Sequence, residues 1–202
     1  MGTEARLVFY APDTATALVA ARAAFARLAE LDSLLSRFRD DSEVAALARA
    51  RGAPVPVSDD LWAVLVVAHR FALETEGMFD ATRGRWQELE LDSARQAVTP
   101  GLLFDLGAIG KGYGADQALL VLAAYGMTRA LIEFGGELVA SGPPPRSGGW
   151  VVRVNDTTTL LAHGAISTSG LGLPEGEQVS VRAESGMMAD AMATVGALGR
   201  GR

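Results

Sequence analysis

Apolar residues recur at helical spacing in several stretches of the chain. From about Thr14 they lie three, four and seven residues apart, which predicts a long helix with one buried face. Asp59 or Asp60 would cap a later helix, and Ser42 would cap a short one over Glu43–Ala50. The two predicted buried stripes consist of Leu18, Ala21, Phe25, Leu28 and Leu35 in the first long helix and Leu61, Val64, Leu65, Ala68 and Ala72 in the second.

Shorter apolar runs bounded by turn residues predict strands. They do not alternate strictly with helices, so we expect an α+β fold with mixed, largely antiparallel sheets and flanking helices. The pair Gly135-Gly136 interrupts one strand pattern, which indicates a bulge or a close approach of a ligand to the backbone. The expected strands are Leu7–Tyr10, Leu102–Phe104, Arg129–Phe134, Trp150–Val154, Thr158–Ala162 and Gln178–Arg182, and a last helix is expected over Ala189–Gly196.

One segment combines several glycines with a lysine. Asp105–Asp116 would join the strand ending at Phe104 to a helix over Ala115–Tyr125, and it carries four glycines around Lys111. Glycines let backbone N–H groups approach an anion, and a helix N-terminus favours negative charge, so the segment suits a phosphate or pyrophosphate. The alternative is an ordinary strand-to-helix turn. The pattern is not a Walker P-loop, because no Ser or Thr follows the lysine, and it lacks the Rossmann glycine spacing.

Composition narrows the possible classes of protein. The 202 residues are 49% hydrophobic and carry a formal net charge of −6 with no basic cluster, so we expect no nucleic-acid partner. The absence of cysteine excludes disulfides and thiolate metal sites. No run approaches the ~18 apolar residues of a membrane span, and the first residues contain no signal-peptide hydrophobic region. The chain as given is therefore expected to be cytoplasmic, or exported if a leader has been removed.

Seven short motifs, taken together and in order, resemble those of the ApbE-type flavin transferases, which move FMN from FAD onto a Ser or Thr of a target protein. The resemblance runs through most of the chain and implies one flavin-transferase-like domain over residues 1–202 with an ApbE-like fold. The matching segments are Met1–Thr3, Ser36–Glu43, Gly77–Thr82, Asp105–Asp116, Gly135–Glu137 with Ser141-Gly142, Ser167–Gly170 and Ala189–Thr194.

The resemblance assigns a Mg²⁺ site and a catalytic pair. Asp190, Thr194 and the backbone carbonyl of Ala108 would bind Mg²⁺, a hard ion that takes oxygen ligands. Asp190 and Thr194 are one helical turn apart and so share a face. Lys111 would face the FAD pyrophosphate, and Lys111 and Asp190 would be the catalytic residues. The alternative for Asp190 is an acid favoured by its place near a helix N-terminus.

The resemblance also assigns the lining of an FAD pocket. Phe79 has a second interpretation as a core residue, and Thr168 as an ordinary strand residue. Phe38, between two arginines, would stack on a ring or lie in a solvated loop. The residues that the resemblance places at FAD are Met1, Phe38, Met78, Phe79, Asp80, Lys111, Gln117 and Thr168.

The chain departs from the family pattern after Gly170. Family members carry a long insert there that ends in His-x-x-Asp-Pro-x-Thr-Gly, whereas Gly170–Gln178 is short and has no histidine. The family also continues with a further strand and helix, whereas this chain ends at Arg202. Three functions follow from the resemblance: Mg²⁺-dependent transfer of FMN from FAD to an acceptor protein, binding of FAD or a nucleotide without transfer, and Mg²⁺-dependent hydrolysis of FAD to FMN and AMP.

Overall fold

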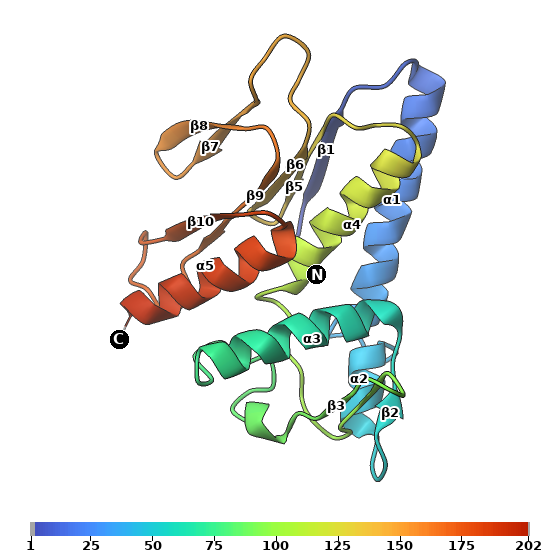
Figure 1. Cartoon of the computed structure of the whole chain (residues 1–202), viewed down its shortest axis with the longest axis vertical. Coiled ribbons are helices and arrows are strands. Elements are labelled where there is room, and N and C mark those ends of the chain that lie inside the picture. Colours follow the sequence, from blue (N-terminus) through green and yellow to red (C-terminus); the bar gives the residue numbers. More distant parts are fainter. Residues whose placement is uncertain (1–2, 202) are drawn as a thin grey trace. The chain divides into compact units, whose positions relative to one another are not determined.

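The structure is a computed structural model, and it describes residues 3–201. The chain forms two compact units (Figure 1). The smaller unit comprises Glu30–Gly110, and the larger unit comprises the described residues up to Ala29 and those from Lys111 onward. The first long helix, α1 (Thr14–Leu35), begins in the larger unit, and its last residues belong to the smaller one.

The smaller unit contains two helices and three very short strands. Ser42 caps α2, as predicted, by accepting a hydrogen bond from the Ala45 backbone N–H at 3.0 Å. The cap of α3 is Ser58, not Asp59 or Asp60, which lie in its first turn. All five residues of the predicted α3 stripe are buried. The elements are α2 (Glu43–Arg49), β2 (Val55–Pro56), α3 (Asp59–Glu74), the 3₁₀ turn η1 (Trp86–Glu88), β3 (Leu91–Asp92) and β4 (Ala97–Val98), with antiparallel strand order β2-β4-β3.

A five-stranded antiparallel sheet organises the larger unit, in the order β1-β5-β6-β9-β10. Successive side chains in each strand point to opposite faces. In β5, Ala130, Ile132 and Phe134 are buried on one face of the sheet. Helix α5 packs on the same face of the sheet, along β9 and β10 (Figure 1). The elements are β1 (Ala5–Phe9), α4 (Gly110–Ala124), β5 (Ala130–Phe134), β6 (Glu137–Ser141), β7 (Trp150–Val154), β8 (Thr157–Leu161), β9 (Gly164–Ser169), β10 (Val179–Ala183) and α5 (Gly186–Arg200).

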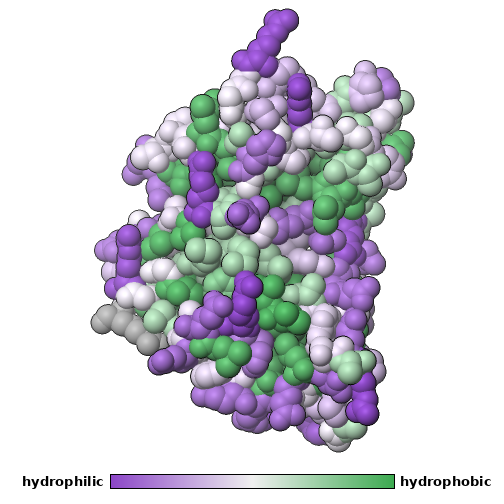
Figure 2. All heavy atoms as spheres, in the orientation of Figure 1, coloured by the Kyte–Doolittle hydropathy of each residue, from purple (hydrophilic) through white to green (hydrophobic). Residues whose placement is uncertain are grey.

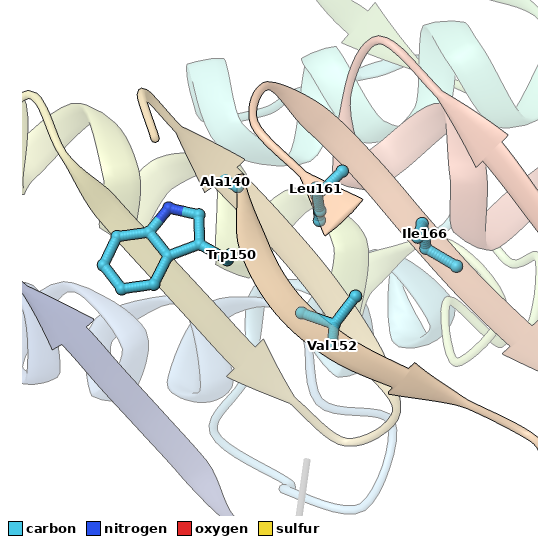
Figure 3. Close-up of a cluster of buried hydrophobic side chains, with 5 residues drawn as sticks. All are labelled: Ala140, Trp150, Val152, Leu161 and Ile166. Atoms are coloured by element: carbon cyan, nitrogen blue, oxygen red, sulfur yellow. The ribbon is translucent and has the colours of Figure 1, made fainter. Parts of the chain in front are cut away.

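A separate hairpin, β7–β8, packs on the other face of this sheet. Its buried side chains meet those of β6 and β9 in one apolar cluster (Figure 3). The indole N–H of Trp150 donates to the Gly142 carbonyl at 2.8 Å, so the one polar atom of this ring is satisfied. The cluster consists of Ala140, Trp150, Val152, Leu161 and Ile166.

The structure corrects the interpretation of the glycine pair. Gly135 and Gly136 form a two-residue turn rather than a bulge, because Phe134 and Glu137 are paired across β5 and β6. Their φ angles are +59° and +95°, and hairpin turns with positive φ at both positions match the right-handed twist of the strands. Thr168 lies in a strand, as its second interpretation expected; this strand, Gly164–Ser169, pairs with both β6 and β10.

Three other predictions need correction. Leu102–Phe104 is not a strand; the run is apolar because Leu102 and Phe104 are buried. The helix expected from Ala115 begins at Gly110, so most of the glycines lie inside its first turns. The long α1 helix is confirmed, and Leu28 and Leu35 of its predicted stripe are buried. Leu18 and Phe25 are exposed, however, and Ala20, Ala24 and Leu31 are buried beside Leu28 and Leu35.

The α+β class with largely antiparallel sheets is confirmed. In the part of the chain that the structure describes, no helix has the length and apolarity needed to cross a membrane. On the face shown in Figure 2, hydrophobic residues are interspersed with hydrophilic ones.

Candidate functional site

Asp190 lies at the centre of a buried group of charges in the larger unit. It is the fifth residue of α5, whose N-terminus is capped by the Ser185 side chain, and it is 3% exposed. Its carboxylate accepts from Lys111 Nζ at 3.2 and 3.3 Å and from the Gly112 backbone N–H at 3.1 Å. The two predicted catalytic residues, 79 positions apart in the chain, are therefore in direct contact.

Glu137 is a second buried carboxylate beside this pair. It begins β6, is 1% exposed and lies 3.7 Å from Lys111 Nζ. Burial, and then the charge of Asp190, raise the pKa of Glu137 to about 8, while the Ser167 hydroxyl and Lys111 act in the opposite direction. Burial also raises the pKa of Asp190, against the lowering effects of Lys111 and the Gly112 N–H.

Glu137 was not predicted as a site residue. Its position after the Gly-Gly pair was noted in the sequence, but nothing there indicated that the side chain is buried beside Lys111. Glu137 Oε2 and Ser167 Oγ are both buried, and neither has a partner of hydrogen-bond geometry among the described residues. The hydroxyl is nevertheless close enough to lower the pKa of Glu137.

Several oxygen atoms here suit a hard cation. Thr194 lies one turn after Asp190 on the same face of α5 and is 5% exposed. The carboxylate of Asp190, the hydroxyl of Thr194 and the unsatisfied oxygen of Glu137 are all ligands of the kind that Mg²⁺ prefers. Among the described residues no cluster of three His, Cys, Asp or Glu side chains could hold a metal, so a cation would also need hydroxyl, backbone or substrate oxygens. Ala108 belongs to the smaller unit, in the turn that precedes α4.

The predicted FAD residues of the smaller unit have different environments. Phe38 is 78% exposed, and the Arg37 guanidinium lies 4.0 Å from its ring centroid. Phe79 is 2% exposed and packs against Phe71 with ring centroids 5.6 Å apart, as its core interpretation expected. Met78 is half-buried. Of the predicted wall, Phe38 is therefore the aromatic side chain presented to solvent.

Asp80 holds together its own loop in the smaller unit. One carboxylate oxygen accepts from the backbone N–H and the hydroxyl of Thr82, both at 2.6 Å. The other accepts from the Gly84 backbone N–H. Both oxygens thus already have intramolecular donors, although a carboxylate can accept additional bonds from a ligand.

The remaining predicted FAD residues lie in the larger unit, except Met1, which is outside the described residues. Gln117 accepts from the Arg27 guanidinium at 3.1 Å. Thr168 follows Ser167 in β9, so it points to the opposite face of the sheet from the Lys111 cluster. On that face the Thr168 hydroxyl is hydrogen-bonded to the Ser180 hydroxyl at 2.8 Å, and Thr168 lines a cavity of about 360 Å³.

Known proteins resemble this chain in both sequence and structure. Residues 1–89 and 83–173 match the ApbE family. The chain is 31% identical to an FAD:protein FMN transferase of Treponema pallidum, over 70% of this chain and 50% of that protein. The chain spans about half the length of the first curated relatives that it matches.

Solved structures show the same fold. An ApbE protein from Thermotoga maritima superposes with a TM-score of 0.85 at 21% identity, covering 100% of this chain and 85% of that one. The apo form of the flavinyl transferase ApbE from Pseudomonas stutzeri gives a TM-score of 0.82 at 22% identity, covering 97% and 85%. The predicted ApbE-like fold is confirmed, and the chain belongs to the ApbE family.

Proposed function

We propose that this protein transfers FMN from FAD to a Ser or Thr hydroxyl of an acceptor protein, with Mg²⁺ and with release of AMP. The observation that carries the proposal is the buried contact of Lys111 with Asp190 beside the N-terminus of α4. Membership of the ApbE family supports it, as does the name FAD:protein FMN transferase that its relatives bear.

The reaction is a phosphoryl transfer. The acceptor oxygen forms a bond to the phosphorus on the FMN side of the pyrophosphate. The bond from that phosphorus to the bridging oxygen breaks, AMP leaves with the bridging oxygen, and the hydroxyl proton is released to solvent. Because negative charge grows on the pyrophosphate oxygens, the residues of this chain act mainly by positioning and by electrostatic stabilisation.

Lys111 would supply part of this stabilisation. Its side chain is 24% exposed, so its ammonium is held by Asp190 on one side and remains reachable by a ligand. The dipole of α4 also favours negative charge at its N-terminal end. Asp190 and Thr194 would hold Mg²⁺, which when bound neutralises charge on the pyrophosphate.

The short segment after Gly170 favours one alternative, FAD binding without turnover, whereas the other, FAD hydrolysis, would use the same residues as transfer. Gly170–Gln178 forms two tight turns, in which Leu173 N–H donates to the Gly170 carbonyl at 3.1 Å and Glu177 N–H to the Pro174 carbonyl at 3.0 Å. Glu175 and Glu177 are the only residues of this segment with ionisable side chains, and it contains no histidine. Acceptor activation would therefore depend on other groups or on the acceptor itself.

The test separates the three functions. The protein is incubated with FAD and Mg²⁺, with and without a flavin-acceptor protein, and AMP, free FMN and acceptor-bound flavin are measured. Transfer predicts AMP and bound flavin in equal amounts when the acceptor is present. AMP with free FMN in both cases would identify a hydrolase, and FAD binding without AMP would identify a binding protein. The same assay is applied to Asp190→Asn, which should lose activity. Asp156→Asn, at a fully exposed carboxylate of the same unit, is its matched control.

A further inference from the structure

Helices α4 and α5 touch through their backbones where each begins. A Cβ atom added at Gly112 would overlap the Gly186 carbonyl, and one added at Gly186 would lie 2.5 Å from the Gly112 carbonyl oxygen. Cβ atoms do not approach backbone atoms so closely, so glycine is required at both positions. The contact fixes the distance between the two helices at the turn that carries Lys111 and one turn before Asp190.

Asp116 joins the same two helices from the α4 side. Its Oδ1 accepts from the Gly186 backbone N–H at 2.7 Å, and its Oδ2 accepts from the Met187 N–H at 2.9 Å. These donors belong to the first turn of α5, where N–H groups lack acceptors in their own helix. A carboxylate at this end is also favoured by the helix dipole. Asp116 therefore caps a helix that begins 70 residues later in the chain.

Asp190 makes the reciprocal contact from α5 to α4. It accepts from the Gly112 N–H, which likewise lies in the first turn of its helix. Each helix thus supplies a carboxylate to the N-terminal backbone of the other. Because Gly186 and Asp190 are separated by one turn, a shift or rotation of α5 where Asp116 holds it would move Asp190 relative to Lys111.

We propose that Asp116 is a positioning residue, which holds α5 in the register that places Asp190 and Thr194 beside Lys111. The functional role of this arrangement, holding a Mg²⁺ site, rests on the proposed function. The contacts of Asp116 with α5 do not depend on it. Both carboxylate oxygens of Asp116 accept from the backbone of α5, so Asp116 acts on Asp190 through that helix.

The chain contains a matched control for simple helix capping. Ser185 caps the same helix, accepting from the Met188 N–H at 3.3 Å, but it belongs to the chain leading into α5 and does not tie that helix to α4. If Asp116 merely stabilised the helix, Asp116→Ala and Ser185→Ala would have similar effects on the site. If it positions α5, only the Asp116 variants disturb Asp190.

The first measurement is the affinity for Mn²⁺ alone, by calorimetry without FAD, at a temperature where every variant is folded by circular dichroism. We expect Asp116→Ala to weaken binding about tenfold, as removal of a group that orients a metal ligand typically does. Asp116→Asn keeps one carbonyl acceptor and should lie between this variant and the wild type. Ser185→Ala should stay within about twofold of the wild type. Equal effects of the Asp116 and Ser185 variants would overturn the proposal.

A second measurement does not depend on the metal. Hydrogen exchange of the Gly112 amide, followed by NMR, reports on its bond to Asp190. Exchange should accelerate at least tenfold in Asp116→Ala, or in Asp116→Asn if the alanine variant does not fold, and should stay unchanged in Ser185→Ala. Unchanged exchange in the Asp116 variant would overturn the proposal. Wild-type protein that binds no Mn²⁺ would contradict the metal site of the proposed function, and this exchange experiment would still decide the role of Asp116.

Discussion

Replacing Glu137 with glutamine should make the protein more stable and less sensitive to pH. The pKa of Glu137 is raised from 4.5 to about 8 in the folded protein, chiefly because the carboxylate is buried. The folded state therefore keeps this proton at pH values where the unfolded state has released it. Stability from this group is fully present below about pH 4.5 and is lost as the pH rises toward 8.

The size of the effect follows from linkage. Each pH unit in this window lowers the free energy of unfolding by about 1.4 kcal/mol for one group. Since Glu137 shares its charge environment with Asp190, we expect a total of about 2–5 kcal/mol between pH 5 and pH 8.5. Glu137→Gln removes the ionisable group while keeping its size, so its stability should change much less over the same range.

The assay is urea denaturation in metal-free buffer at several pH values from 5 to 8.5. Glu133→Gln is the control, because Glu133 lies in the neighbouring strand β5 with its side chain 52% exposed. This variant should follow the wild-type curve. A wild-type stability that does not fall with pH, or a Glu137→Gln variant that falls just as steeply, would refute the assignment of a buried, protonated Glu137.

Three further predictions test other parts of the structure. Phe79→Ala should lower the free energy of unfolding by about 3–5 kcal/mol, since the ring is a core residue, and a loss below about 1 kcal/mol in denaturation would contradict this. Ser58→Ala should cost about 1 kcal/mol by the same assay, whereas Asp60→Ala should cost less; the reverse order would contradict the cap of α3. Gly112→Ala should weaken Mn²⁺ binding and lower the melting temperature, because its Cβ would overlap the α5 backbone; a variant with unchanged values would show that α5 can move aside.

The sequence predicted which helices and strands form better than it predicted which of their faces are buried and where they begin and end. Helical periodicity located α1, but small residues decided its buried face, because Ala20 and Ala24 are buried while Leu18 and Phe25 are exposed. Serine rather than aspartate caps α3, and both residue types are good caps, so composition alone could not decide between them. Helix α4 begins at Gly110, before its predicted start at Ala115, because glycine is a poor helix former and its first turns were therefore not expected to be helical.

The site was predictable in part. Spacing showed that Asp190 and Thr194 share a helix face, whereas their association with Lys111 came from the family resemblance, because no local pattern links residues 79 positions apart. Glu137 was missed because a carboxylate after a Gly-Gly pair is expected to be an exposed turn residue. It is buried because alternate side chains of β6 point to the face of the sheet that the helices cover, and Glu137 is one of them. Asp116 ended a recognised motif, yet its partners, Gly186 and Met187, become evident only from the contact between the first turns of α4 and α5.

The most direct test of the proposed function is the release of AMP from FAD as Mg²⁺ is titrated, comparing wild-type protein with Asp190→Asn and with the exposed control Asp156→Asn. We predict saturable, Mg²⁺-dependent release by the wild type and the control. In Asp190→Asn we predict a loss of at least about 100-fold, because this substitution removes the buried carboxylate that would bind the metal and that contacts Lys111. AMP release that is independent of Mg²⁺, or that survives in Asp190→Asn, would contradict a metal-assisted phosphoryl transfer at this cluster.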